Sequence, residues 1–204
     1  MKLYYAPGVC SLAVHIALNE LDATYDLEKV DLATKETETG RNFTTVNPLG
    51  YVPALEIDGS DILLEAPVIL QYLADTHPQA KLAPPAGTRD RLRLQESLNF
   101  TASELHKSFG PFFAAIKPEG ALKDQAMKKL KSRFDRLNDM LADGRAYVMG
   151  EDFSVADAYT FVVANWAGVI DLDLSPWPHV QAYVARVGAR PKVQAAMKRE
   201  GLIN

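Results

Sequence analysis

The first reactive side chain to consider is Cys10, the one cysteine of the chain. It stands between residues 2–5, which are typical of a short strand, and residues 11–20, whose apolar spacing predicts a helix. A thiol in the first turn of a helix faces unpaired N–H groups and the positive end of the helix dipole, which favours the thiolate. Cys10 is therefore a candidate nucleophile, with Tyr5 and Ser11 as neighbouring hydroxyls that could assist it. The alternative is that Cys10 is a small buried hydrophobe, which is common for a lone cysteine.

A second polar group lies on a predicted helix near the middle of the chain, at Asn99, Ser103, His106 and Lys107. These spacings place the four side chains along one flank of the helix, away from its apolar stripe. Such a helix can lie across a cleft above Cys10, where His106 could donate a hydrogen bond to a thiolate or stabilise it. The alternative is that His106 is simply an exposed side chain.

The elements that must position these groups begin with an alternation of strand and helix signals over the first 80 residues. Strands are predicted at 2–5, 24–30, 54–57 and 61–64, helices at 11–20 and 65–76, and a loop or short helix at 33–42. Asp58-Gly59 is a strong hairpin signal between the last two strands. The order β-α-β-(α)-β-β-α resembles that of a thioredoxin-like module.

Residues 77–88 are rich in proline, which indicates a linker. Every long segment beyond it has helical period, and one apolar stripe is predicted to run from Leu94 to Ile116. We therefore predict an α/β thioredoxin-like N-terminal domain at residues 1–80 and an all-α helical bundle domain at residues 88–204.

Later helices are predicted around 130–141 and 180–187, and Pro191 opens a last one. Ser154 and Asp157 have capping-box spacing, with Asp in place of the usual Glu or Gln. They precede a segment that is apolar nearly all round, as expected of a helix at the centre of a bundle. This motif is expected to affect folding more than catalysis.

The thioredoxin-like order makes a specific demand on Val52-Pro53. In such modules a cis-proline beside the active helix leaves the preceding amide and carbonyl free to pair with an extended peptide. Dithiol members of the fold carry a second cysteine at the position that is Ala13 here. Any disulfide of Cys10 must therefore be formed with an external thiol.

Glu65-Ala66 opens the predicted helix at 65–76. A carboxylate beside a helix N-terminus can hold the ammonium and the carboxylate of one amino-acid group, although a first-turn acid is also common without a ligand. Lys35 could meet a further peptide carboxylate, or it could be a solvated loop lysine. Together with Val52 and Cys10, these residues describe a site for a zwitterionic, thiol-bearing peptide, and glutathione fits that description.

Composition narrows the class of protein further. The net charge is −4 and no dense basic run is present, so we expect no nucleic-acid partner. No apolar stretch reaches the roughly 20 residues of a membrane span, and the N-terminus lacks a signal-peptide hydrophobic region. A lone cysteine fits a reducing, cytoplasmic setting. We expect no metal and no membrane partner.

The chain resembles the bacterial beta-class glutathione S-transferases over essentially its whole length. The motifs that carry this resemblance are Lys2-Leu3-Tyr4-Tyr5, Pro7-Gly8-Val9-Cys10-Ser11, Asn47-Pro48-Leu49-Gly50-Tyr51-Val52-Pro53, Glu65, Gln71-Tyr72-Leu73-Ala74-Asp75, Glu104-Leu105-His106-Lys107 and Ser154-Val155-Ala156-Asp157. The pairing of Cys10 with His106 points to the beta class. The family implies a thioredoxin-like domain, an all-helical domain and a homodimer.

The resemblance also implies a set of glutathione contacts. They are Cys10, Lys35, Val52, Glu65, Ala66, Asn99, Ser103, Glu104 and His106, some of which can come from the partner chain. Ala66 replaces the serine of many transferases, so that its amide remains while a hydroxyl contact is lost. Ala158 would make only a weak hydrophobic staple with Phe153.

The leading functional hypothesis is an enzyme that conjugates the thiol of glutathione, as co-substrate, to a hydrophobic electrophile. Thiol–disulfide exchange through Cys10 would be a second activity. Alternatives are glutathione-dependent dehalogenation, isomerisation or peroxide reduction, activation by Tyr4 or Tyr5 alone, and a non-catalytic glutathione or hydrophobic-ligand binding protein. The electrophile pocket is expected among Phe109, Phe112, Phe113 and Trp166.

Overall fold

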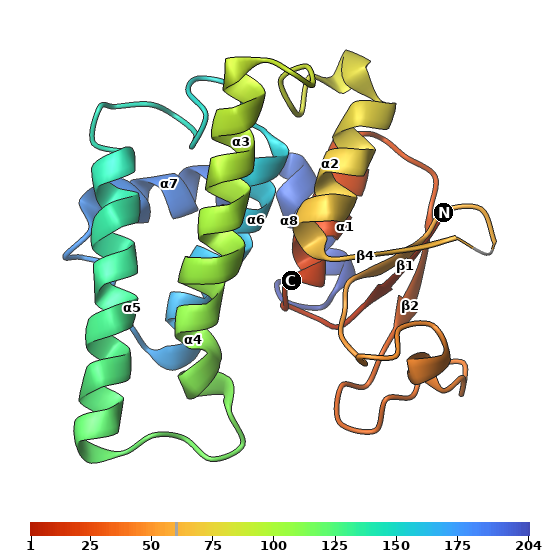
Figure 1. The fold of residues 1–204 in the computed structure, drawn as a ribbon, viewed down its shortest axis with the longest axis horizontal. Coiled ribbons are helices and arrows are strands. Elements are labelled where there is room, and N and C mark those ends of the chain that lie inside the picture. Colours follow the sequence, from red (N-terminus) through yellow and green to blue (C-terminus); the bar gives the residue numbers. More distant parts are fainter. Residues whose placement is uncertain (60) are drawn as a thin grey trace.

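The computed structural model describes residues 1–59 and 61–204 and confirms the predicted fold class (Figure 1). A four-stranded sheet has the order β2-β1-β3-β4, in which β1 is parallel to β2 and antiparallel to β3, and β3 is antiparallel to β4. The elements of this half are β1 (Lys2–Tyr5), α1 (Ser11–Glu20), β2 (Asp26–Lys29), β3 (Ala54–Glu56), β4 (Ile62–Leu64) and α2 (Ala66–Thr76). The predicted hairpin is confirmed, because β3 and β4 pair antiparallel. Residue 60 lies outside the described residues.

The remaining helices form the second half of the molecule. They are α3 (Arg89–Asn99), α4 (His106–Phe113), α5 (Gly120–Met140), α6 (Val155–Asn165), α7 (Pro178–Gly188) and α8 (Pro191–Arg199). Figure 1 shows α2 and α3 side by side at the centre of the molecule, with the sheet on one side and α5 on the other. No helix of the described residues is both long and apolar enough to cross a membrane.

The structure confirms one expectation for local structure and corrects another. The segment 33–42, predicted as a loop or short helix, is a loop with turns and isolated bridges, and a short 3-10 helix follows at Phe43–Thr45. The apolar stripe from Leu94 does not reach Ile116, because α4 ends at Phe113 and Ile116 is 91% exposed. Pro111 lies inside the last turn of α4, where it removes a backbone donor to the preceding turn, and the helix ends where Ala114 takes an extended conformation.

Alternation along β1 sends successive side chains to different sides of the sheet. Leu3 and Tyr5 join the large core shared with the helices, whereas Tyr4 belongs to a smaller cluster with Phe43 on the other face. The strand therefore separates two hydrophobic layers.

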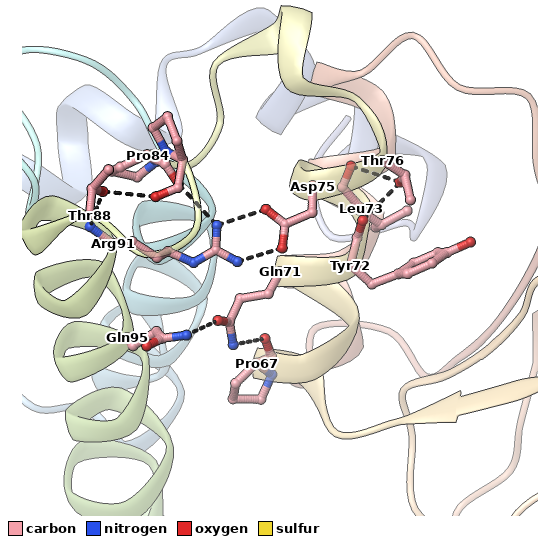
Figure 2. Close-up of polar contacts among 11 residues, drawn as sticks. Pro67, Gln71, Tyr72, Leu73, Asp75, Thr76, Pro84, Thr88, Arg91 and Gln95 are labelled. Atoms are coloured by element: carbon pink, nitrogen blue, oxygen red, sulfur yellow. Dashed lines mark hydrogen bonds and ion pairs between the residues drawn. The ribbon is translucent and has the colours of Figure 1, made fainter.

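Polar side chains connect α2 to α3 across the junction between the halves, as Figure 2 shows. Arg91 makes two hydrogen bonds to the Asp75 carboxylate, at 2.7 and 2.6 Å, and a third to the Pro84 carbonyl at 3.0 Å. One turn further on, the Gln95 amide donates to the Gln71 side chain at 2.9 Å. Because Arg91 is 4% exposed, its paired geometry fixes the relative position of the two helices.

Helix α6 begins with the predicted capping box. The Asp157 carboxylate accepts hydrogen bonds from the Ser154 amide at 2.9 Å, the Ser154 hydroxyl at 2.8 Å and the Val148 amide at 2.8 Å. Asp157 is fully buried, and burial raises its pKa to about 6 despite these donors. The motif therefore provides hydrogen bonds at the start of a helix whose first ten residues are all buried.

We expect Ser154→Ala to lower the free energy of unfolding by about 0.5–2 kcal/mol, because it removes a helix-capping hydroxyl. Urea unfolding of the purified protein measures this change. Ser175→Ala is the matched control, since the Ser175 hydroxyl also binds a neighbouring aspartate but is exposed in a loop. Equal losses from the two substitutions would show that the capping position has no special role.

Candidate active site

A pocket of about 340 Å³ lies where the two halves of the molecule meet. Its walls come from the turn between β1 and α1, the loop before β3, the start of α2, and the helical segment around His106. Residues singled out in the sequence line it together, namely Cys10, Lys35, Val52, Pro53, Glu65, Ala66, His106 and Lys107. The structure therefore gathers into one cavity groups that lie up to about a hundred positions apart in the sequence.

Cys10 immediately precedes α1, and its thiol donates a hydrogen bond to the Val52 carbonyl at 3.2 Å. Burial, with a smaller contribution from the nearby Glu65 carboxylate, raises the pKa of this thiol to about 12. The N–H groups of Cys10 and Ser11 and the ammonium of Lys107 act in the opposite direction but are weaker. The expected thiolate is therefore wrong for this structure, because loss of solvent outweighs the helix N-terminus.

The Val52–Pro53 peptide bond is cis, as predicted. The expectation that the Val52 carbonyl is free is only partly met, because the Cys10 thiol donates to it. A carbonyl oxygen can accept two hydrogen bonds, so a ligand that pairs with this carbonyl either shares it with the thiol or displaces the thiol.

Glu65 is the residue immediately before α2, and its backbone has a φ of 68°. Its carbonyl accepts the amides of Val68 and Ile69 at 3.0 Å, so the first turn of the helix holds it in this conformation. A positive φ is unfavourable for a residue with a side chain, and such strain persists where surrounding contacts enforce it. The result brings an exposed carboxylate and the first amide of α2, that of Ala66, to the same wall of the pocket.

Lys35 approaches the pocket from the loop after β2. Its φ is 61°, and its ammonium donates to the Gly50 carbonyl at 3.1 Å. Gly50 in turn has a φ of 67°, and a Cβ there would come within 3.1 Å of the Lys35 side chain. Glycine is therefore required at this close approach, which holds the Lys35 cation at the rim of the cavity.

His106 lies at the first position of α4, directly after a π-helical segment at Phe100–Leu105. Its Nδ1 shares a hydrogen bond with the Tyr159 hydroxyl at 2.8 Å, and its ring meets the Trp166 ring edge-on at 4.7 Å between centroids. Burial lowers the pKa of His106 to about 4, and the Lys107 ammonium adds to the effect. At neutral pH His106 is thus an uncharged imidazole that can act as a hydrogen-bond donor.

Two hydroxyls predicted to assist the sulfur lie elsewhere. Tyr5 is 8% exposed and packs in the core against His15, with ring centroids 6.3 Å apart, because strand alternation turns it away from the pocket. The Ser11 hydroxyl is fully buried and bonds to both the amide and the carbonyl of Ala6. Neither hydroxyl lines the cavity, so their predicted catalytic roles are corrected to structural ones.

Three of the contacts implied by the family resemblance also lie outside the lining of this pocket. Asn99 and Ser103 are exposed, and the Ser103 hydroxyl donates to the Asn99 carbonyl at 2.8 Å. Glu104 forms an ion pair with Arg133 of α5, at 2.6 Å. In the single chain these side chains therefore lie along an outer flank of the helix, where the helical spacing alone could not separate them from His106.

Aromatic rings extend from His106 into the helical half. Phe109 stacks on Phe113 with 5.9 Å between centroids, and the edge of Trp166 meets both rings at 5.7 and 5.5 Å. Phe113 is 46% exposed, whereas Phe112 is 9% exposed. The predicted aromatic residues thus lie beside His106, with Phe113 as the ring that is open to solvent.

The sequence analysis missed two features of this site. Tyr159, the partner of His106, lies 53 positions away, and the π-helical segment that precedes His106 leaves no distinct apolar pattern. The signal available for Tyr159 was its place within the capped helix α6. In the apolar stretch 158–164, Tyr159 and Thr160 are the two residues that carry a polar group.

A larger groove of about 1250 Å³ lies at the linker and the adjoining ends of α3 and α5. Charged side chains of both signs line much of it, and neither Cys10 nor His106 reaches it. Within residues 1–59 and 61–204 no cluster of three or more His, Cys, Asp or Glu side chains could hold a metal ion. The smaller pocket is therefore the site with chemistry to offer.

Known proteins match this chain across both halves. The family model described as the N-terminal domain of glutathione S-transferase matches residues 8–76, and the one described as the C-terminal domain matches residues 100–191. Glutathione S-transferase GstA of Escherichia coli O157:H7 is 41% identical over 202 residues, covering 99% of this chain and all of that protein.

Solved structures agree with this match. A bacterial beta-class glutathione S-transferase of Sphingomonas chungbukensis is 46% identical, with a TM-score of 0.95 and complete coverage of both chains. A sphingomonad glutathione S-transferase complexed with glutathione is 45% identical, with a TM-score of 0.94 and complete coverage. The chain therefore belongs to the glutathione S-transferase family of enzymes. Its resemblance to the bacterial beta class is confirmed.

We expect the ring signals of His106 to titrate with a midpoint near pH 4, well below the ordinary 6.5, because burial disfavours the charged imidazole. A proton NMR titration measures the midpoint, and His106→Gln assigns it by removing one of the four histidine signals. A midpoint at the ordinary value would show that the imidazole is solvated and charged on acidification.

Proposed function

We propose that this protein transfers the thiol of glutathione to a hydrophobic electrophile. The observation that carries the proposal is the convergence of Cys10, Val52, Glu65 and His106 on one pocket between the two halves. The glutathione complex of the 45%-identical relative supports the same ligand. Residues 1–80 would then hold glutathione, and residues 88–204 would supply the electrophile site.

Complementary charge and hydrogen bonding orient the peptide in this proposal. The Glu65 carboxylate receives the ammonium of the γ-glutamyl group, and the amide of Ala66 at the start of α2 receives its carboxylate. The Val52 backbone pairs with the peptide as an added strand would. Lys35, at the rim of the cavity, receives the carboxylate at the other end of the peptide. The sulfur then lies between Cys10 and His106.

Cys10 acts in conjugation as a hydrogen-bond donor. Its thiol remains protonated at neutral pH, since burial keeps its pKa near 12. When the peptide displaces it from the Val52 carbonyl, the S–H can donate to the glutathione thiolate, as can the uncharged imidazole of His106. These donors stabilise the negative sulfur after its proton leaves for solvent. The sulfur then attacks the electrophile, and a leaving group departs with the electron pair of the broken bond.

Thiol–disulfide exchange is the proposed second activity. The Cys10 thiol loses its proton and attacks one sulfur of oxidised glutathione. The new bond joins Cys10 to that sulfur, the original disulfide breaks, and the other glutathione leaves as a thiolate that takes up the proton. The raised pKa of Cys10 makes this route slow until the thiol moves out of its partly buried position.

The aromatic cluster of Phe109, Phe113 and Trp166 is the proposed electrophile site. It adjoins His106 through Trp166, and Phe113, which is 46% exposed, is the ring of the three that is open to solvent. Apolar and aromatic substrates pack well against such rings.

We also propose a homodimer in the cytoplasm. Exposed apolar side chains at Val68 on α2 and Leu92 on α3 suit the faces that the family uses for dimerisation. In that assembly the exposed Asn99 and Ser103 can reach the partner's pocket, which would account for their place in the family's contact set.

We expect Glu65→Gln to weaken glutathione binding by about 1.5–3 kcal/mol, the range for a charge-assisted hydrogen bond. The lost group holds the ammonium end of the peptide, so the rate of the chemical step should change less. Calorimetry with glutathione measures the binding. Glu119→Gln is the matched control, because Glu119 also directly precedes a helix but lies at the start of α5. A dissociation constant unchanged by Glu65→Gln would place glutathione elsewhere.

Cys10→Ala should abolish covalent capture of glutathione while leaving part of the conjugating activity. Capture requires a protein sulfur, and the chain has no second cysteine. Conjugation uses the sulfur of glutathione, which His106 can still contact. Intact-protein mass spectrometry after incubation with oxidised glutathione measures capture, and turnover of a model electrophile measures conjugation. If the native protein binds glutathione but never gains a reducible adduct, Cys10 is a buried structural thiol and the exchange activity does not exist.

A further inference from the structure

The Gly8 peptide, two residues before Cys10, is held from both sides by the C-terminal half of the chain. Its amide donates to Glu200 Oε2 at 2.9 Å, and its carbonyl accepts from Trp166 Nε1 at 2.8 Å. The φ of Gly8 is +72°, and a Cβ there would come within 3.2 Å of the Leu202 side chain. Glycine is therefore needed for the approach of these C-terminal residues.

The two side chains that hold Gly8 are themselves buried and fixed. The Glu200 side chain is fully buried, and its other oxygen lies 2.8 Å from Nδ1 of His15 in α1, which is also fully buried. Trp166 is 7% exposed. A carboxylate without solvent is costly unless its oxygens are bonded, so both partners of Glu200 are needed to keep it there.

The rest of the segment before Cys10 is held equally closely. The Ser11 hydroxyl bonds to the amide and the carbonyl of Ala6, so the segment 6–8 is anchored at each end. Cys10 is two residues after Gly8, and its thiol donates a hydrogen bond to the Val52 carbonyl. A shift of the Gly8 peptide would therefore move the thiol relative to Val52.

We infer that Glu200 and Trp166 are positioning residues, which hold the Gly8 peptide so that the Cys10 thiol stays in register with Val52. Glu200 and Trp166 lie 190 and 156 positions from Cys10 in the sequence, so distant residues set the place of the thiol. The inference rests on the proposed role of Cys10 in the pocket. Direct alkylation of the thiol tests it independently of glutathione.

The experiment compares two rates in native protein, namely alkylation of Cys10 by iodoacetamide and capture of oxidised glutathione. Because the chain has one cysteine, every adduct reports Cys10. The variants are Glu200→Met, which has similar length and no acceptor, and Trp166→Phe, which lacks the indole donor. Glu200→Gln keeps an acceptor for the Gly8 amide and should restore the native rates.

We expect both variants to alkylate about tenfold faster than the native protein, the change produced when a thiol gains solvent and its pKa falls by about one unit. The ratio of the capture rate to the alkylation rate should fall by about tenfold. Alkylation needs only access and thiolate, whereas capture also needs the sulfur aligned with the bound peptide. A native protein that alkylates but never captures would refute the exchange activity and leave the alkylation test of Glu200 and Trp166 intact.

Matched controls separate positioning from general destabilisation. Trp177→Phe removes a buried indole donor, which bonds Asp135 at 2.7 Å. Glu20→Met removes a largely buried carboxylate, which pairs with Arg190. Neither control should change Cys10 alkylation by more than about twofold, since neither side chain contacts the segment before Cys10.

Urea supplies the second readout. Alkylation through local release of the Gly8 segment should have a rate independent of urea below the unfolding transition. Alkylation through global unfolding should instead accelerate with urea as steeply as the free energy of unfolding falls. Native alkylation rates in both Glu200→Met and Trp166→Phe would overturn the inference. So would equal acceleration in the two controls, or a urea dependence that matches global unfolding.

Discussion

Helix α1 is buried on every side, and the rest of the structure depends on how it is packed. The residues from Ser11 to Leu18 are all buried, because α1 lies against the sheet, against α2, and against α6 and α8 of the helical half. Its position is therefore set by both halves of the molecule at once. Cys10 at its start inherits that position, and the pocket opens where the two halves diverge around it.

Burial of α1 also decides the chemical state of the thiol. A helix N-terminus contributes about 0.3–1 kcal/mol to an exposed charge, and up to about 2 kcal/mol in favourable geometries. Full burial can shift a pKa by up to about 3–5 units, each worth about 1.4 kcal/mol. Loss of solvent therefore wins at Cys10, whose pKa lies near 12, and at His106, whose pKa lies near 4. Both groups are uncharged at neutral pH and offer hydrogen bonds to a negative sulfur.

The parts of the site that could be predicted from the sequence are those written in local patterns. The strand, the Pro-Gly break and the helical spacing around Cys10 placed the thiol correctly, and the turn-rich loop before β3 pointed to the cis bond at Val52–Pro53. Glu65 was found because a helix begins directly after it. Each of these signals arises within a few residues, where the backbone itself determines the geometry.

The features that were missed depend on contacts between distant residues. The bond from Tyr159 to His106 spans 53 positions, and that from Glu200 to Gly8 spans 192. Proximity to Cys10 in sequence wrongly favoured Tyr5, and local pattern alone left open whether the thiol is buried. Local spacing shows which side chains share a face, but only the packing of the two halves shows which face meets solvent.

The proposed mechanism depends on glutathione binding between the halves with its sulfur beside Cys10. A crystal structure of the native protein with glutathione tests this placement most directly. We expect the γ-glutamyl group at Glu65 and Ala66, peptide pairing at Val52, and the ligand sulfur within hydrogen-bond distance of the Cys10 thiol. Glutathione bound in the larger groove at the linker, or in this pocket with its sulfur turned away from Cys10, would contradict it.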